Sequence, residues 1–249
     1  MVKETLRIAA IADVHGNLGA LQAVLAHIQG ISSPDLIVNL GDHVSGPLQP
    51  RETAELLMSI PQIAIRGNHD RQLLEGSSET ESVDRYAREQ LDPFHLSWLS
   101  GLGATAWIEN EVFLCHGTPS SDIEYFLENP NSSGSTPASE EQVAHRAGNC
   151  PASLILCGHS HTPRALRLPD GRLIVNPGSV GIPAYLRTPE HSQELDGGTP
   201  HTRYALLEHT RDWQVELIEV DYDWQAASRL AASRGRLDWA KVLAGHFGR

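Results

Sequence analysis

The chain has 249 residues, which suits one large domain or two small ones, and its 40% hydrophobic content is ordinary for a globular protein. Its net charge of −12 argues against sequence-independent binding of nucleic acid, because such binding needs Lys and Arg against phosphate. No stretch of the sequence approaches the roughly 20 apolar residues of a membrane span.

The first half of the sequence alternates predicted strands with predicted helices. Apolar residues at helical spacing predict the first helix, which Gly30 closes, and Asp92-Pro93 is a suitable cap and first-turn pair for the last one. This alternation argues for a parallel sheet covered by helices. Strands are expected at residues 6–12, 36–40 and 62–65, and helices at 18–29, 50–59, 82–91 and 93–100.

The second half of the sequence favours strand pairs, such as the two runs on either side of the turn Pro169-Asp170-Gly171. Segments 129–139 and 187–202 are expected to be loops, and long loops in a compact domain often have a functional role. We expect one domain over residues 1–249, with a core at about 5–220 and a helical extension at about 223–249 that serves stability or assembly. Strand pairs are expected at 104–108 with 111–115, 164–168 with 172–175, and 203–208 with 213–220, and helix at 224–247 with a break near residue 235.

Cysteine content and the first residues indicate the compartment. There are three cysteines, and Cys115 and Cys157 each end a predicted strand, where a small buried hydrophobic residue is the ordinary explanation. Residues 1–5 lead directly into a predicted strand and lack the apolar core of a signal peptide. We therefore expect no disulfides and a cytoplasmic protein.

Polar clusters directly follow five short apolar runs of the sequence. A strand that ends in a carboxylate or an imidazole at its carboxyl edge is the usual location of a site in an α/β protein. Each cluster alone has an ordinary explanation, such as a helix cap or a turn residue, but five together indicate one site. The mixed oxygen and nitrogen donors suit divalent transition metals and are too many for one ion. The clusters are Asp13-Val14-His15, Gly41-Asp42, Gly67-Asn68-His69-Asp70, Cys115-His116-Gly117 and Gly158-His159-Ser160-His161.

In this order, the clusters resemble the calcineurin-like metallophosphoesterase superfamily over roughly residues 5–220. The strings at 11–17 and 176–181 resemble its small bacterial and archaeal phosphodiesterase branch. The resemblance implies an α/β fold in which two packed mixed sheets are flanked by helices, a four-layer αββα sandwich. It also implies phosphoester hydrolysis with two metal ions, in which a hydroxide that bridges the metals attacks phosphorus in line.

The resemblance implies which residues hold the two metals. Asp42 would be shared, because two adjacent dications repel each other unless an anion lies between them. Mn²⁺ is the first expectation, with Fe, Ni, Co and Zn as alternatives, since selectivity follows availability as much as geometry. The first metal would be held by Asp13, His15, Asp42 and His161, and the second by Asp42, Asn68, His116 and His159.

Other residues of the motifs are implied to act on the substrate. His69 would lie outside both coordination spheres and give a proton to the leaving oxygen, or stabilise charge there. Asp70 would orient the ring of His69. The string at 176–181 has two equal explanations, a glycine-rich turn or a phosphate cradle in which Gly178 and Ser179 contact the substrate.

The string at residues 41–47 narrows the range of expected substrates. The phosphoprotein phosphatase branch has Gly-Asp-x-Val-Asp-Arg-Gly, whereas this chain ends the string in Ser45, Gly46 and Pro47 and lacks the arginine. We therefore expect a phosphodiester or small nucleotide substrate. From the acidic charge and the lack of a long apolar stretch, we expect no nucleic-acid or membrane partner. The alternatives are a dinucleoside polyphosphate hydrolase, a phosphomonoesterase, or a non-catalytic binding scaffold similar to the retromer subunit, against which the complete motif set and His69 argue. The sequence leaves the oligomeric state open.

Overall fold

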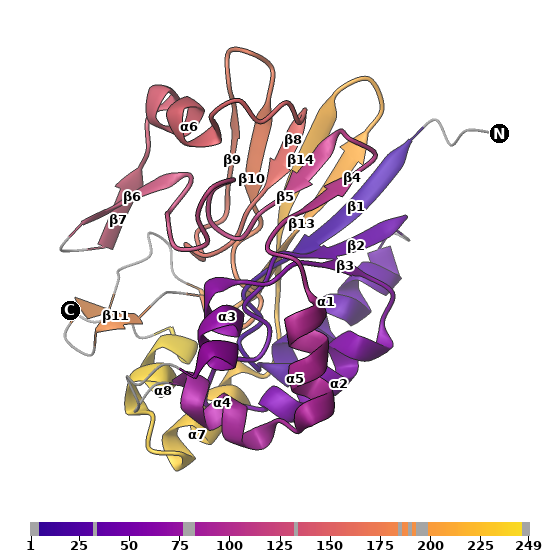
Figure 1. Cartoon of the computed structure of the whole chain (residues 1–249). Helices are drawn as coiled ribbons and strands as arrows, with labels where there is room; N and C mark the ends of the chain where they lie inside the picture. Colours follow the sequence, from indigo (N-terminus) through magenta and orange to yellow (C-terminus); the bar gives the residue numbers. More distant parts are fainter. Residues whose placement is uncertain are drawn as a thin grey trace.

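The computed structural model describes residues 5–31, 34–76, 83–131, 134–183, 186–188, 191–192 and 199–245. Two five-stranded mixed sheets pack face to face and helices cover their outer faces (Figure 1). The predicted fold class, a mixed α/β sandwich with two packed sheets, is confirmed. Among the described residues, no helix combines the length and the apolar character needed to cross a membrane.

The first sheet has the strand order β14-β13-β1-β2-β3. Its strands β1, β2 and β3 are parallel, and the β13–β14 hairpin joins β1 in antiparallel fashion. Helices α1 and α2 follow β1 and β2, as the alternating pattern predicts. The bounds are β1 (Leu6–Ile11), α1 (Leu18–Ile31), β2 (Leu36–Asn39), α2 (Pro50–Ser59), β3 (Ile63–Ala64), β13 (Thr202–His209) and β14 (Trp213–Val220).

The second sheet has the strand order β4-β5-β8-β10-β9. Its central strands β5, β8 and β10 are parallel, and β4 and β9 are antiparallel edges. Helix α6 (Glu140–Ala147) buries Val143 and Ala147 in the cluster on the outer face. The bounds are β4 (Ala106–Ile108), β5 (Val112–Leu114), β8 (Leu154–Leu156), β9 (Arg164–Arg167) and β10 (Leu173–Asn176).

The core between the sheets explains the continuous apolar runs that mark the strands. Ile8 and Ala10 of β1 point into this core, whereas Ala9 and Ile11 pack against the helices on the other face. A strand that is buried on both faces needs apolar residues at every position, since successive side chains alternate between the faces. The polar residues that end each run therefore come where the strand leaves the core.

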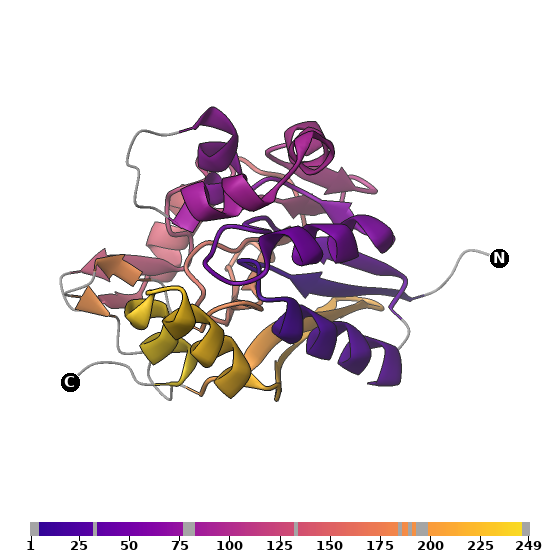
Figure 2. The same cartoon turned by 90° about the horizontal axis from the view of Figure 1, so that it is seen from below.

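The remaining helices gather at the end of the sheets where the parallel strands stop. Figure 2 shows α7 and α8, in yellow, beside the loops at this end. Both contribute to a core cluster with Leu48 and Ile182, and the predicted break lies at Gly235, which has a φ of 77°. This packing supports our proposal that the chain forms one domain. The bounds are α3 (Asn68–Glu75), α4 (Val83–Gln90), α5 (Pro93–Gly101), α7 (Trp224–Ser233) and α8 (Leu237–Leu243).

Three local features differ from the expectations. Helix α3 was not predicted, because its sequence is strongly polar; Asp70 initiates it by accepting a hydrogen bond from the N–H of Gly67. The prediction of a loop at 129–139 is wrong, because β6 (Glu128–Asn131) and β7 (Gly134–Pro137) pair as antiparallel strands. Within the loop expected at 187–202, the short strands β11 (Leu186–Thr188) and β12 (His191–Ser192) pair, and residues 189–190 and 193–198 lie outside the described residues.

Candidate metal centre

The five polar clusters converge at one end of the two sheets. Each follows a parallel strand, and the carboxyl ends of β1, β2, β3, β5 and β8 meet there. Within the described residues, two groups of three buried side chains each bring their ligand atoms within 4.8 Å of one another. The groups are Asp13, His15 and His161, and Asp42, His116 and His159.

Asp42 lies between the two groups. Its Oδ2 is 3.8 Å from Nε2 of His15 and 3.2 Å from Nε2 of His116. Asn68 joins the second group, because its Oδ1 is 2.9 Å from Nε2 of His116. In the first group, Nε2 of His161 is 3.2 Å from Nε2 of His15. The fold therefore brings all seven predicted ligand residues together.

Backbone carbonyls set the orientation of the imidazole rings. Nδ1–H of His15 donates to the oxygen of Ser45 at 2.8 Å, and Nδ1–H of His161 donates to the oxygen of Ile182 at 3.0 Å. A carbonyl can only accept, so the neutral ring presents the lone pair of Nε2 to the site. His15 and His161 thus aim two lone pairs at each other, and this arrangement is repulsive unless a cation lies between them.

The second group shows the same use of carbonyls. Nδ1–H of His116 donates to the oxygen of Leu40 at 2.7 Å, which directs Nε2 toward Asn68 and Asp42. His159 is reversed, because its Nε2–H donates to the oxygen of Ile123 at 3.0 Å and leaves Nδ1 for the site. This donor set of carboxylate, amide oxygen and imidazole fits a divalent transition metal in each group.

Burial and neighbouring charge set the protonation of the site. Burial lowers the pKa of His15 to about 4 and the pKa of His159 to about 3, so both rings are neutral at pH 7 and can bind metal. Burial also raises the pKa of Asp13 to about 8. Burial lowers the pKa of His116, but the charges of Asp42 and Asp13 and the hydrogen bonds of the ring together outweigh burial and raise the pKa to about 10. Metal binding would therefore displace protons from Asp13 and His116.

The backbone at the site is bent in a way that few residues tolerate. Left-handed φ values cost a non-glycine residue roughly 1–2 kcal/mol, and such strain concentrates at functional sites. Glycine also allows the loops after β2 and β3 to touch, because a Cβ on Gly67 would lie 2.2 Å from Oδ1 of Asp42. The strained residues include Asp13, His15, Asp42, His159 and His161, with φ values of 54°, 49°, 56°, 66° and 57°.

His69 lies beside the two groups and belongs to neither. Its ring centroid is 5.5 Å from that of His15, and its side chain is 13% exposed. Nδ1 lies 3.1 Å and 3.2 Å from the two carboxylate oxygens of Asp84. Burial lowers the pKa of His69, but the charges of Asp42 and Asp84 outweigh it and raise the pKa to about 9. Without bound metal, the ring is therefore protonated at pH 7.

Comparison with known proteins identifies the family. The model of the calcineurin-like phosphoesterases matches residues 6–163. The chain belongs to this family. It is similar to an uncharacterised protein of Methanocaldococcus jannaschii, with 26% identity over 250 residues, 93% of this chain and 94% of that protein. The family and the two donor groups together suggest two divalent metal ions.

Solved structures agree with this assignment to the calcineurin-like phosphoesterases. The crystal structure of a metallophosphoesterase from Sphaerobacter thermophilus is 28% identical, with a TM-score of 0.74 over 96% of this chain and 100% of that chain. A putative diadenosine tetraphosphatase shares the fold, with a TM-score of 0.52 and 17% identity over 86% of this chain and 94% of that chain. The predicted family is confirmed.

Asp70 has a different role from the one expected of it. Its carboxylate accepts three backbone N–H groups and the ring Nδ1–H of His43, the latter at 2.7 Å. It thereby ties the loop after β2 to the start of α3. The carboxylate that faces the ring of His69 is Asp84, which belongs to no motif and resembles any acidic residue in the first turn of a helix. The three N–H groups belong to Asp42, His43 and Gly67.

The hydrogen bonds of the string at 176–181 favour the glycine-rich turn over the phosphate cradle. The N–H of Gly178 donates to Oδ1 of Asn176, and the hydroxyl of Ser179 donates to the oxygen of Asp13 at 2.8 Å. The N–H groups of Val180 and Gly181 donate to the loop after β1. These donors are already satisfied inside the protein, which favours the turn and gives Ser179 a role in holding Asp13; the contact of Gly178 and Ser179 with substrate stays a prediction.

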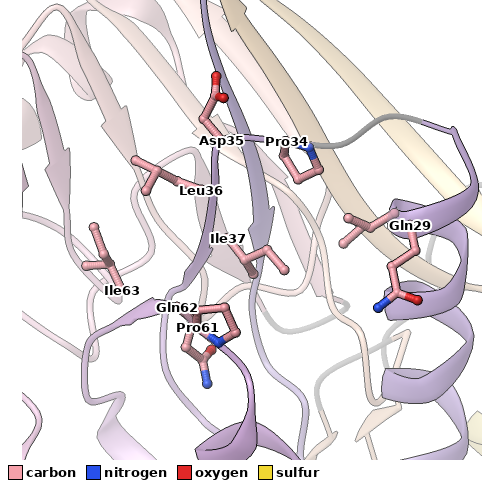
Figure 3. Close-up of a pocket in the computed structure, with 9 residues that line it drawn as sticks. Gln29, Pro34, Asp35, Leu36, Ile37, Pro61, Gln62 and Ile63 are labelled. Carbon is pink, nitrogen blue, oxygen red and sulfur yellow. The ribbon is translucent and has the colours of Figure 1, made fainter.

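A cavity of about 670 Å³ opens beside the second donor group. Asn68 and His159 line it, together with Gln72, Tyr125 and Arg146. A second cavity of about 450 Å³, shown in Figure 3, lies at the opposite end of the first sheet and contains none of the predicted site residues. Of these two cavities, the one beside the second donor group contacts predicted site residues and is the candidate substrate pocket.

Proposed function

We propose that this protein is a phosphodiesterase that uses two divalent metal ions, Mn²⁺ first among them. The position of Asp42 supports the proposal most strongly, because its Oδ2 faces one nitrogen of each donor group. A carboxylate shared by two sites is what a pair of cations requires. When bound, the two cations would activate a water molecule and neutralise charge on the phosphoryl group.

The residues of the chain would divide the remaining work. Asp13, His15, Asp42 and His161 would hold one cation, and buried surroundings would strengthen their electrostatic effect. Asn68, His116 and His159 would hold the other together with Asp42. His69 would donate its proton to the leaving oxygen, since its partly exposed ring borders both groups.

The cavity beside the second donor group supports a substrate larger than a simple phosphate monoester. Its volume of about 670 Å³ falls in the range of small-molecule pockets, and Tyr125 supplies an aromatic ring. A phosphodiester or a small nucleotide would place its second substituent there. A dinucleoside polyphosphate hydrolase is the second candidate, because the same cavity could accept a nucleoside. The proposed location is the cytoplasm, in line with the three free cysteines.

A substrate panel with Mn²⁺-loaded protein tests the proposal. We expect faster hydrolysis of bis(4-nitrophenyl) phosphate and of short dinucleotides than of 4-nitrophenyl phosphate, and loss of all activity in Asp42→Ala. His201→Ala is the matched control, because that histidine faces Glu219 and Asp221 at the surface. A clear preference for the monoester would contradict the phosphodiesterase proposal, and preference for diadenosine tetraphosphate would favour the second candidate.

His69→Ala tests the chemistry of the leaving group. The variant should keep both metal ions and lose roughly 10²–10⁴ in turnover with an alkoxide leaving group, the usual contribution of acid–base catalysis. The loss should be much smaller with nitrophenolate, which scarcely needs a proton. Equal losses with both substrates would rule out proton donation, and loss of an ion would place His69 among the ligands. A non-catalytic scaffold would show no hydrolysis with any substrate.

A further inference from the structure

Asp84 is a buried carboxylate that lies outside every motif of the sequence. It is 6% exposed in the first turn of α4, and its Oδ1 accepts the hydroxyl of Ser45 at 2.5 Å. Among the ion pairs of the described residues, its one partner is His69. A carboxylate is buried at a considerable cost in desolvation, which other groups must offset. An acidic residue that merely favoured the start of a helix would remain at the surface.

We propose that Asp84 is the residue that positions His69 for proton donation, and this inference rests on the proposed function. Both carboxylate oxygens lie within 3.2 Å of Nδ1, so they fix the rotation of the ring and keep the hydrogen on Nδ1. Because the imidazole is rigid, Nε2 then points away from Asp84. In the reaction the proton of Nε2 moves to the leaving oxygen and forms its O–H bond, while Nδ1–H remains bound to Asp84.

Ser45 links this pair to the first donor group. Its hydroxyl donates to Asp84, and its carbonyl oxygen accepts Nδ1–H of His15 at 2.8 Å. Ser45 is fully buried, so neither contact competes with bulk water. One residue therefore sets the positions of both a candidate metal ligand and the carboxylate behind His69. This explains how the ring of His69, which belongs to α3, keeps a defined distance from the first donor group.

The chemistry of the carboxylate can be tested with Asp84→Asn. The amide is similar in size, but it carries no charge and offers one acceptor oxygen in place of two. We expect a 10–100-fold loss of kcat with an alkoxide leaving group, the typical effect of removing an outer partner, with KM and metal content close to wild type. With nitrophenolate the loss should be a few-fold. A loss of equal size with both leaving groups would overturn the proposal.

The double variant His69→Ala/Asp84→Asn separates positioning from a general structural role. If Asp84 acts through His69, the double variant should be no slower than His69→Ala alone, because residues that act as a unit are not additive. Additive losses would overturn the proposal. Ser45→Ala, which removes one hydroxyl and keeps the carbonyl, is a second variant should Asp84→Asn fold poorly. It should show the same dependence on the leaving group with a smaller loss.

An observation that does not need activity is the ¹⁵N spectrum of the histidine rings in Zn²⁺-loaded protein. His69→Ala assigns the His69 signals, and Asp84→Asn should shift the Nδ1 signal of His69. Asp92→Asn is the matched control, because Asp92 pairs with Nδ1 of His95 at 2.8 Å and belongs to no motif, and it should leave His69 unchanged. Unchanged His69 signals in Asp84→Asn would overturn the positioning role. An absence of hydrolysis in wild type, with shifted His69 signals in Asp84→Asn, would instead overturn the proposed function.

Discussion

Glu128 offers a sharp test of how the site is built into the fold. It lies on β6 with 2% exposure, and its Oε2 accepts the hydroxyl of Ser160 at 2.7 Å. Ser160 separates His159 from His161, so this hydrogen bond holds the loop that carries two candidate ligands. Burial raises the pKa of Glu128 from 4.5 to about 7, although the Ser160 hydroxyl and nearby arginines favour the charged form. The substitution Glu128→Gln removes this ionisation and keeps an oxygen for Ser160.

The expected effect on stability follows from the two pKa values. Below pH 4.5 both the folded and the unfolded protein carry the proton, so the group contributes no pH dependence. Between pH 4.5 and about 7 only the folded state keeps it, and the free energy of unfolding of the wild type falls as the pH rises. At 1.36 kcal/mol per unit, the full difference is roughly 3 kcal/mol and is reached above pH 7. The free energy of unfolding of Glu128→Gln should not fall in this way, because glutamine does not ionise.

Urea unfolding of metal-free protein across this pH range measures the effect. Relative to wild type, Glu128→Gln should gain up to about 3 kcal/mol between pH 4.5 and 8, with the gain concentrated below pH 7. Glu111→Gln, at an exposed position, is the control and should change stability by less than about 0.5 kcal/mol at any pH. A difference between Glu128→Gln and wild type that is the same at pH 4.5 and pH 8 would refute the reasoning.

Three further predictions concern the metal centre and its supports. Elemental analysis should find about two metal ions per chain. Asp42→Ala should weaken the binding of both ions, and His15→Ala chiefly the binding of one. An Asp42→Ala protein that binds two ions normally would refute the idea that both ions share Asp42. Gly67→Ala should lose metal, because its Cβ would lie 2.2 Å from Oδ1 of Asp42, whereas Gly101→Ala, with nothing within 4 Å, should retain it. Trp239 is 5% exposed, and the centroid of its ring lies 6.0 Å from that of His15. Trp239→Ala should therefore lower the free energy of unfolding, measured in urea, by roughly 3–5 kcal/mol. A loss below about 1 kcal/mol would show that α8 does not support the site.

The sequence was a good guide to the central strands and to the residues at their ends. Apolar runs predict strands that are buried on both faces, and the polar residue after each run marks the point where the strand leaves the core. The order of the clusters then carries the resemblance to the family that the comparisons confirm. The sequence did not predict the β6–β7 hairpin, because its Pro, Asn and Ser residues are poor strand formers. Contacts from elsewhere in the chain support this hairpin, since Arg146 and Arg164 donate to backbone oxygens at residues 126–128.

The sequence by itself determined which residues stand at the strand ends, since that depends on local hydrophobic pattern. Only the tertiary structure decided which of their atoms face the site and what holds them there. Asp84 lies 39 residues from Ser45, and Ser160 lies 32 residues from Glu128, so no local pattern could pair them. Asp70 shows the same limit, because sequence placed it beside His69 while the fold turns its carboxylate to His43. The packing of distant segments decides which groups a buried polar side chain bonds. A residue far along the chain is therefore as able to be its partner as a neighbour in sequence.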